Sequence, residues 1–591
     1  MPLWHSYAMM QLTDEQKDVC SLECLDDICH MSIIACAGSG KTLTATRRLF
    51  EIYKLLRQKE SIALFSYSNV AVSTFYNELR KILVLQKDNP VHISTFDSFL
   101  AEFIVTPHGK RKMGCTCSPF LISGSESFLE WPNYKIWAEA NARGKSNKIP
   151  FRLDELYLKP DSNKIAFYVK KGNLSYDVEP QEAWAKIKLA GKLGGYTHIL
   201  RSLWAALILD AEPRLVDIIS NKFPYILIDE AQDIGFLHAH IVDKLSNNSK
   251  VTLIGDPNQA IYKFAHADGS FLRAFAQNKC GSHKPITCNW RSIEPITKLA
   301  SKLSGSETTH RRIPKNDFCG IFYLTYEPGK EGTLGYEYAD FLVSKGYSVQ
   351  GSAILCRSND MVDKVMCKKT SSGEGSTKRF AESAIERDTH CEPRAAFNKL
   401  IRAMFSLMKE VPADIPKKIS NTYWDANTLQ LRRALWEFWR SPETGLPPSS
   451  LAAKSEWLTR LKANLGVFLP EFSAYSGLQV KDSWGKVIRN TNLPDGPLYA
   501  SYSSPELPTP SIRIDTVHKA KGENLDSVLY VATKPHLEAF LAGTGTEEGR
   551  IGYVALTRAR DLFVIAIPAS CLKAHGTKLA ELNIVPLPSI N

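Results

Sequence analysis

One short segment has the residue types and spacing of a phosphate-binding loop. Ala35-Cys-Ala-Gly-Ser-Gly-Lys-Thr42 lies between an apolar run and an amphipathic one, with alanine where the first glycine usually stands. Backbone N–H groups of residues 38–41 could wrap phosphate oxygens, and the helix that follows would point its positive end at them. Lys41 would bridge the β and γ phosphates, and Thr42 would hold Mg²⁺. The segment predicts nucleotide binding; the alternative is a glycine-rich turn without a ligand.

A second candidate group is an apolar run that ends in two carboxylates. Tyr225-Ile-Leu-Ile-Asp229-Glu230 has the pattern of a buried strand with Asp229 and Glu230 at its C-terminal end. Open α/β sheets bind ligands at that end of their strands, where Asp229 could hold Mg²⁺ and Glu230 could deprotonate an attacking water. An acidic pair at a strand end is also common as a helix cap, so the pattern is weak evidence alone.

These residues need a scaffold that places strand ends beside helix starts, and the hydrophobic pattern predicts one. Short apolar runs alternate with segments whose apolar residues recur at helical spacing. Alternating strands and helices imply parallel sheets covered on both faces, so the predicted fold class is α/β with two such cores. Strands are expected at 31–36, 61–67, 91–95, 225–228 and 251–254 in the first core, and at 321–325 and 352–356 in the second.

Two segments interrupt this alternation, and we expect each to be an inserted, mainly helical subdomain. The first is polar and irregular, with a basic turn at 110–112; the second is rich in tryptophan and follows a basic loop at 368–379. Basic loops of this kind are more often solvated surface than binding sites. The predicted boundaries are 1–99 and 196–290 around an insertion at 100–195, and 291–384 and 506–591 around an insertion at 385–505.

Composition excludes several classes of protein and indicates a class of partner. The 591 residues include 73 Lys and Arg against 62 Asp and Glu, a net charge of +11 that favours a polyanionic partner without proving one. The hydrophobic content excludes a disordered, collagenous or coiled-coil chain. No apolar run is long enough to span a membrane, and the N-terminus lacks the features of a signal peptide, so we expect a cytoplasmic protein. The closest cysteine groupings, expected to be reduced thiols rather than zinc ligands, are Cys20, Cys24 and Cys29 beside His30, and Cys115 with Cys117.

With Ala231-Gln-Asp233 the acidic pair extends to Asp-Glu-Ala-Gln-Asp, and here the chain resembles the UvrD/Rep family of superfamily-one DNA helicases. The resemblance covers nearly the whole length, because further segments match the family's motifs in the family's order. They are Leu12-Thr-Asp-Glu-Gln16, Tyr67-Ser-Asn-Val-Ala71, Thr95-Phe-Asp-Ser-Phe99, Gly255-Asp-Pro-Asn-Gln-Ala-Ile-Tyr262, Asn289-Trp-Arg-Ser292, Asp515-Thr-Val-His-Lys-Ala-Lys-Gly522 and Tyr553-Val-Ala-Leu-Thr-Arg-Ala-Arg560. The resemblance implies two RecA-like P-loop domains with ATP and Mg²⁺ between them.

The resemblance also implies a role for each residue of the nucleotide site. Gln16 would read the adenine edge, and Trp290 would stack on the nucleotide; ordinary core packing is the alternative for Trp290. Gln259 would sense the γ-phosphate, and Arg291 and Arg558 would reach it from the second core, since guanidinium suits developing phosphoryl charge. Surface ion pairs are the alternative for these arginines. The implied catalytic residues are Lys41, Glu230, Gln259, Arg291 and Arg558, and the implied binding residues are Gln16, Ala37, Gly38, Ser39, Gly40, Lys41, Thr42, Trp290, Arg291 and Arg558, with Thr42 and Asp229 as metal ligands.

For single-stranded DNA, the family's base-stacking positions fall on Tyr67 and Phe264. Aromatic stacking on a base tolerates any sequence, which suits a motor that must pass every base. Both rings could instead be core aromatics. By the same resemblance Asn69, Thr95, His518 and Lys519 are DNA contacts, of which Thr95, His518 and Lys519 would touch the phosphate backbone.

Three departures from the family pattern put nucleotide affinity and coupling in doubt, but not the class. Leu43 stands where the family often has an arginine near the nucleotide. Phe264-Ala265-His266 replaces the more usual aromatic-Arg-Gly. Asn524 stands where the family usually has a ribose-binding glutamate, and the adjacent Glu523 is expected to point elsewhere.

The function that follows is an ATP-dependent translocase or helicase on single-stranded DNA, or on a duplex with a single-stranded tail, moving 3′ to 5′ by family resemblance. The alternative is a nucleotide-gated DNA-binding subunit that regulates a nuclease and unwinds little. The chain ends about 30 residues after Arg560, so no fused nuclease domain is expected behind the motor. Compact members of the family act beside a separate nuclease in anti-phage systems, the Gabija type among them, which suggests a nuclease or ATPase partner and a role in antiviral defence.

Overall fold

The structure is a computed structural model. It describes residues 12–22, 29–83, 90–122, 124, 126–142, 145–161, 164–171, 174–262, 266–280, 282–366, 375–390, 393–409, 411–412, 415–420, 426–491, 493–498 and 512–588. The chain divides into two compact units. The first unit comprises residues 1–108, 202–366 and 510–591, and the second comprises 109–201 and 367–509. The first unit therefore contains most of both predicted cores, and the second contains the bulk of both predicted insertions together with residues 367–384 of the predicted second core.

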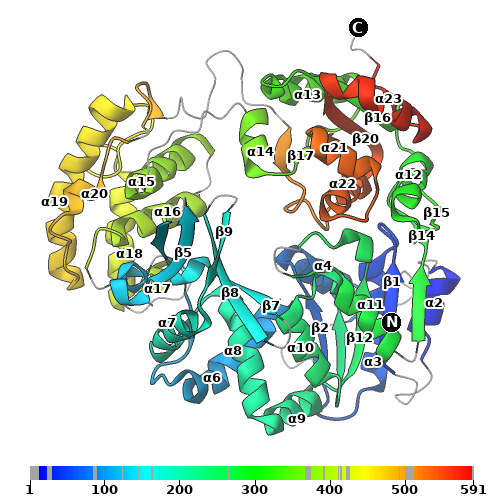
Figure 1. The fold of residues 1–591 in the computed structure, drawn as a ribbon, viewed down its shortest axis with the longest axis horizontal. Helices are drawn as coiled ribbons and strands as arrows, with labels where there is room; N and C mark the ends of the chain where they lie inside the picture. The colour runs from blue at the N-terminus through cyan, green and yellow to red at the C-terminus, as the bar shows by residue number, and fades with distance from the viewer. Residues whose placement is uncertain are drawn as a thin grey trace. The chain divides into compact units, whose positions relative to one another are not determined.

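A six-stranded parallel sheet forms the first core, with strand order β13-β1-β12-β11-β2-β3 (Figure 1). Its strands are nearly continuous apolar runs, as expected of strands covered on both faces. Their bounds are β1 Met31–Ala35, β2 Ile62–Ser66, β3 Val91–Thr95, β11 Tyr225–Ile228, β12 Lys250–Gly255 and β13 Ser282–Ile286. The accompanying helices are α2 Asp14–Cys20, α3 Lys41–Leu55, α4 Asn69–Arg80, α5 Phe96–Phe99, α6 Thr106–Met113, α8 His198–Ala211, α9 Pro213–Lys222, α10 Phe236–Leu245 and α11 Ser270–Asn278.

A second six-stranded parallel sheet forms the second core, with order β18-β17-β19-β20-β16-β21. Alternate residues of its central strand enter two different apolar clusters, Val528 and Tyr530 on one face and Leu529 and Val531 on the other, so both faces are buried. The elements are β14 Cys288–Asn289, α12 Glu294–Ser304, β15 Thr309–His310, β16 Gly320–Tyr326, α13 Leu334–Ser344, β17 Ser352–Cys356, α14 Asn359–Val365, β18 Arg513–Thr516, β19 Leu525–Val531, α21 Lys534–Leu541, α22 Glu547–Arg558, β20 Ala559–Pro568, α23 Leu572–Glu581 and β21 Val585–Pro586.

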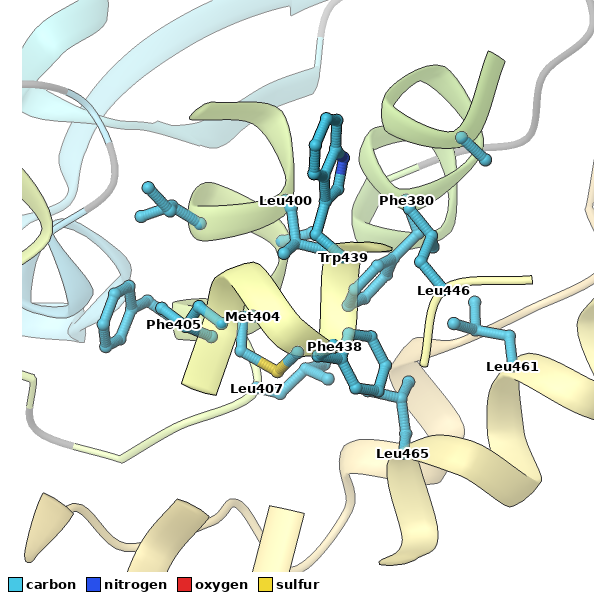
Figure 2. Close-up of a cluster of buried hydrophobic side chains, with 14 of the residues drawn as sticks. Phe380, Leu400, Met404, Phe405, Leu407, Phe438, Trp439, Leu446, Leu461 and Leu465 are labelled. Atoms are coloured by element: carbon cyan, nitrogen blue, oxygen red, sulfur yellow. The ribbon is translucent and has the colours of Figure 1, made fainter. Parts of the chain in front are cut away.

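The helical part of the second unit is built around one apolar cluster. Figure 2 shows Phe380, Met404, Phe438, Trp439 and Leu465 converging from different helices of this unit, and all are buried. This agrees with the expected helical insertion. Its helices are α15 Gly375–Ile385, α16 Pro393–Phe405, α17 Ile415–Ser420, α18 Ala426–Arg440, α19 Leu458–Ser476 and α20 Trp484–Val487.

The first insertion differs in detail from the expected helical subdomain, because antiparallel strands make up much of it. A hairpin precedes a three-stranded sheet, with α7 Pro180–Lys192 after them. The physical reason is period-two burial: in β7 residues 156 and 158 are buried while 157 and 159 are half-exposed. The strands are β4 Phe120–Leu121, β5 Ile136–Ala142, β6 Lys145–Phe151, β7 Leu156–Asp161, β8 Lys164–Lys171, β9 Leu174–Val178 and β10 Gly195–Tyr196.

Within the described residues, no helix is both long and apolar enough to cross a membrane. Cys20, Cys29, Cys115 and Cys117 are free thiols, while Cys24 lies outside the described residues. The described part of the chain also holds no group of three or more His, Cys, Asp or Glu side chains suited to a metal ion.

Candidate active site

The phosphate-loop segment joins β1 to the start of α3 at Lys41. Gly38 and Gly40 have φ of +72° and +79°, which side chains with a Cβ rarely adopt. A Cβ at Gly38 would lie 2.6 Å from both the Arg291 Cβ and the Asn289 Oδ1, so glycine is also required for close approach. The Lys41 Nζ donates to the carbonyls of Ala35 at 3.3 Å and Cys36 at 3.4 Å. These are weak neutral acceptors, and phosphate oxygens would be stronger partners.

Helix α2 carries Gln16 against this loop. A capping box at Thr13 starts the helix, and the Gln16 Nε2 donates to the Ser39 carbonyl at 3.0 Å and to the Thr44 Oγ1 at 3.1 Å. The buried Arg48 of α3 donates to the Val19 carbonyl at 2.6 Å and so ties the end of α2 to α3. Gln16 therefore supports the phosphate loop directly, and its contact with adenine stays a prediction.

Asp229 lies at the C-terminal end of β11, as the sequence indicates. Its side chain is buried, and its Oδ1 has no hydrogen-bond partner among the described residues. Burial, followed by the charge of Glu230, raises the pKa of Asp229 to about 7. An unpartnered carboxylate oxygen beside a phosphate loop fits a hard cation, so Asp229 and Thr42 are residues that would hold Mg²⁺.

Glu230 follows in a left-handed conformation, with φ +54°, that non-glycine residues seldom adopt outside functional sites. Its side chain makes no capping hydrogen bond to the short helix after it, which excludes the helix-cap alternative. Burial alone would raise its pKa, but the Lys521 and Lys41 ammoniums, the hydrogen bond from Gln232 and the charge of Arg558 together outweigh burial and hold the pKa below its usual value. Glu230 is therefore an ionised carboxylate that can accept a proton.

Two residues from different cores meet beside this acid pair. The Arg558 Nη2 at the end of α22 donates to the Gln259 Oε1 at 2.8 Å, and the Gln259 Nε2 donates to the Asp256 Oδ2 at 2.7 Å. Both Arg558 and Gln259 are 2% exposed. Arg558 has no ion-pair partner within the described residues, so the surface ion-pair alternative is wrong for it. Burial lowers the pKa of Arg558, because the interior disfavours the charged form of the guanidinium.

The loop after β14 places Trp290 and Arg291 over the phosphate loop. The Trp290 N–H donates to the Gly38 carbonyl at 2.9 Å, and the Asn289 Oδ1 accepts from the Arg291 N–H at 2.8 Å. Trp290 is 38% exposed, and the Arg311 guanidinium lies 5.3 Å from the centroid of its ring, so core packing is not its role. The Arg291 Nη1 donates to the Thr557 carbonyl at 2.8 Å.

Lys521 is a site residue that the sequence analysis missed. It is 7% exposed and crosses from the second core to the first, where its Nζ bonds Asp233 and the Gln259 carbonyl and lies 3.9 Å from the Glu230 Oε2. Its ammonium also lies 4.8 Å from the centroid of the Tyr262 ring. A lysine two residues after Lys519 in the same motif was the available signal, but the partners are 262 and 288 residues away in sequence.

These groups share one cleft of about 770 Å³ within the first unit. It brings together almost all the residues expected to bind or process a nucleotide, and three of those expected to touch DNA. Buried Ala37 and the DNA-side residues Asn69 and Thr95 do not line it. The predicted residues that do are Gln16, Gly38, Ser39, Gly40, Lys41, Thr42, Tyr67, Asp229, Glu230, Gln259, Trp290, Arg291, His518, Lys519 and Arg558.

The residues predicted to contact DNA have mixed surroundings. Half-buried Tyr67 bonds His238, the Thr95 Oγ1 caps α5 by accepting from the Ser98 N–H at 3.1 Å, and Asn69 is exposed in the first turn of α4. His518 contacts the Ile261 carbonyl through Nε2 at 3.1 Å, and exposed Lys519 pairs with Asp515 at 3.1 Å. Phe264 lies outside the described residues, so its role stays a prediction.

Two of the three departures from the family pattern lie in the same cleft. Leu43 and Asn524 line it, and so does Glu523, which also pairs with Arg513. Ala265 lies outside the described residues, and His266 has φ +56°.

Comparison with known proteins matches both cores to one family. The model of the UvrD/REP helicase N-terminal domain matches residues 14–279, and that of the UvrD-like helicase C-terminal domain matches 381–569. Similar proteins include an ATP-dependent helicase/nuclease subunit of Lactobacillus acidophilus, 39% identical over 19% of this chain and 9% of that protein. The RecBCD enzyme subunit RecB of Mycolicibacterium smegmatis is 25% identical over 35% of this chain and 20% of that protein. The ATP-dependent DNA helicase srs2 of Schizosaccharomyces pombe is 25% identical over 46% of this chain and 32% of that protein.

The chain thus spans less than half the length of each of these relatives. The two domain matches together cover most of the chain, in the order of the two cores that form the cleft. The chain belongs to the UvrD/REP helicase family.

Proposed function

We propose that the protein is an ATP-dependent translocase and helicase that moves 3′ to 5′ along single-stranded DNA. The observation that carries the proposal is the contact between Gln259 and Arg558 beside the phosphate loop and the acidic pair. In a nucleotide motor, the change at the γ-phosphate must move one core against the other. A buried hydrogen bond between the cores, next to that phosphate position, is suited to this coupling.

The residues divide the work of hydrolysis as follows. Lys41 would exchange the Ala35 and Cys36 carbonyls for the β and γ phosphate oxygens, which bind an ammonium more strongly. Glu230 would accept the proton of the attacking water, and Arg558 and Arg291 would stabilise the charge that develops on the transferred phosphoryl group. Mg²⁺ held by Thr42 and Asp229 would screen the remaining phosphate charge.

A strand-displacement assay tests this proposal. Duplexes with a 3′ tail and with a 5′ tail are offered separately, with ATP and Mg²⁺, to the native protein and to Lys41→Ala. The proposal expects displacement of the 3′-tailed duplex by the native protein alone. Equal displacement of both duplexes would contradict the direction. No displacement of either, together with ATP hydrolysis stimulated by single strands, would favour the second candidate.

That second candidate is a nucleotide-gated DNA-binding subunit of a nuclease complex. Two of the relatives are named as subunits, one of a helicase/nuclease and one of the RecBCD enzyme. The departures at Leu43 and Asn524 in the cleft would also suit a protein whose nucleotide controls DNA binding and whose rate of ATP hydrolysis is low. Purification with a separate nuclease, and displacement that appears only when it is added, would support this candidate. A role in antiviral defence would then depend on that partner.

A further inference from the structure

A histidine outside the nucleotide machinery contacts the predicted base-stacking residue. His238 lies on α10, and its Nδ1 is 3.3 Å from the Tyr67 hydroxyl. On the opposite side of the ring, its Nε2 is 2.7 Å from the Ser202 Oγ of α8 and 3.7 Å from the Asp97 Oδ1 of α5. One imidazole therefore joins three segments of the first core to the residue that would stack on DNA.

The neighbours of His238 select one tautomer. A carboxylate oxygen faces Nε2, and a lone pair there would be repelled by Asp97. The proton therefore belongs on Nε2, which donates to the Ser202 Oγ, and Nδ1 accepts from the Tyr67 hydroxyl. In this arrangement both ring nitrogens have partners, and the Tyr67 hydroxyl has a defined direction.

Packing fixes the ring planes as well as the hydrogen bonds. The centroid of His238 lies 4.9 Å from that of Phe96 in an edge-on contact and 5.8 Å from that of Tyr67. The Tyr67 ring also lies 6.5 Å from Phe96. Helix α10 begins three residues after Asp233, so the element that carries His238 continues directly from the acidic segment of the nucleotide cleft.

We propose that His238 is a positioning residue that holds the Tyr67 ring at the angle needed for base stacking, and so sets the affinity for single-stranded DNA. The inference rests on the proposed function, because it requires Tyr67 to be a base platform. Tyr67 is in the loop between β2 and α4, where a side chain without an anchor would occupy several rotamers. Fixing the ring before DNA arrives removes that ordering cost from binding.

The test is a double-mutant cycle on DNA-stimulated ATP hydrolysis. Tyr67→Phe keeps the ring and removes the hydroxyl, while His238→Phe keeps an aromatic ring against Phe96 and removes both nitrogens. Each single variant should raise the DNA concentration for half-maximal stimulation about five-fold, the effect of losing one net hydrogen bond. The double variant should show about the same five-fold rise, because both changes remove one interaction. For His238→Phe the maximal rate at saturating DNA should change less than about two-fold, because the affected step is DNA binding.

His240→Phe is the matched control. His240 lies on the same helix two residues away, but its Nε2 pairs with Asp210 at 2.9 Å on the exposed surface. The DNA concentration for half-maximal stimulation of His240→Phe should therefore equal that of the native protein. If His238→Phe does not fold, Ser202→Ala removes the Nε2 partner without touching either ring. It should raise half-saturation about two- to three-fold, and an unchanged value would overturn the proposal.

The outcomes separate the inference from the function on which it rests. His238 does not position Tyr67 if Tyr67→Ala weakens DNA binding but His238→Phe does not. The same conclusion follows if the double variant raises the DNA concentration for half-maximal stimulation about 25-fold, the product of two independent five-fold effects. If the native protein shows no stimulation by DNA, or if Tyr67→Ala leaves DNA binding unchanged, then Tyr67 does not stack on DNA bases. The proposed role of His238 is then wrong as well, because it depends on that stacking. A melting temperature lowered in His238→Phe without any change in half-saturation would show a structural role only.

Discussion

Replacing Arg558 with alanine should remove catalytic turnover while ATP binding persists. The Arg558 guanidinium donates to the Gln259 Oε1 at 2.8 Å from the opposite core, and it lines the cleft that contains the phosphate loop. Arginines that stabilise phosphoryl transfer contribute on the order of 10³–10⁵ in rate. Because Arg558 is outside the phosphate loop, we expect a loss of about 10³-fold in kcat and only a small change in nucleotide affinity.

The same substitution also has a stability cost that can be worked from its contacts. Arg558 donates to the carbonyls of Val554 and Glu523 as well as to Gln259, and Gln259 is buried. A buried acceptor left unpaired costs about 1–3 kcal/mol, so Arg558→Ala should lower the melting temperature measurably. Steady-state ATPase, binding of a fluorescent ATP analogue and thermal melting must therefore be measured together.

Two variants separate chemistry from stability. Arg550 is on the same helix, α22, and donates to the Ala260 carbonyl at 2.6 Å, but it does not line the cleft. Arg550→Ala should lower stability with little effect on kcat. Arg558→Lys keeps the charge without the forked donors and should remain well below native turnover. If Arg558→Ala hydrolyses ATP within ten-fold of the native rate at saturating ATP, the arginine does not act on the phosphoryl group.

Four further outcomes are expected. Lys41→Ala should abolish ATP hydrolysis, and Glu230→Gln should bind ATP without turnover; a native rate for Glu230→Gln with DNA present would remove it as the base. Binding to single-stranded DNA, measured by fluorescence anisotropy, should weaken steeply with salt and show little sequence preference. A strong sequence preference at fixed salt would contradict the proposal that the protein is a DNA motor. Phe264→Ala should leave ATPase without DNA nearly unchanged but blunt its stimulation by DNA; parallel losses in Phe264→Ala and Arg558→Ala would contradict the division into ATP-side and DNA-side residues.

The core strands could be predicted because strands that are buried on both faces consist of continuous apolar runs. Val91–Thr95, Tyr225–Ile228 and Ser352–Cys356 have the bounds that the sequence indicated. The strands of the first insertion were missed because their signal is alternation between polar and apolar residues over short lengths. In β7, for example, residues 156 and 158 are buried while 157 and 159 are half-exposed. In β8 the apolar centre is short, and Lys164, Lys170 and Lys171 at its ends give the segment a polar appearance. The predicted domain boundaries stay predictions.

Most residues of the site could be predicted from the sequence, but Lys521 and the contacts between the residues could not. The phosphate-loop and acidic segments predicted Lys41, Asp229 and Glu230, the family resemblance implied Gln259 and Arg558, and all five line one cleft. Which atoms meet depends on rotamers and on how the two sheets face one another, which local patterns do not encode. The hydrogen bond from Arg558 to Gln259 joins residues 299 positions apart in the chain.

The acidic segment after β11 shows how one strand end supports several roles at once. Asp229 is buried with an oxygen that has no partner among the described residues, and its pKa is raised to about 7, so it gains most from a bound cation. Glu230 has its pKa lowered by nearby charges, first Lys521 and then Lys41, and would be the ionised base of the proposed function. Asp233 pairs directly with Lys521 of the second core, but burial outweighs that pairing and raises its pKa to about 7 as well. Of the three carboxylates within these five residues, only Glu230 has its pKa held below the usual value, and Lys521 of the second core is the largest of the charges that lower it.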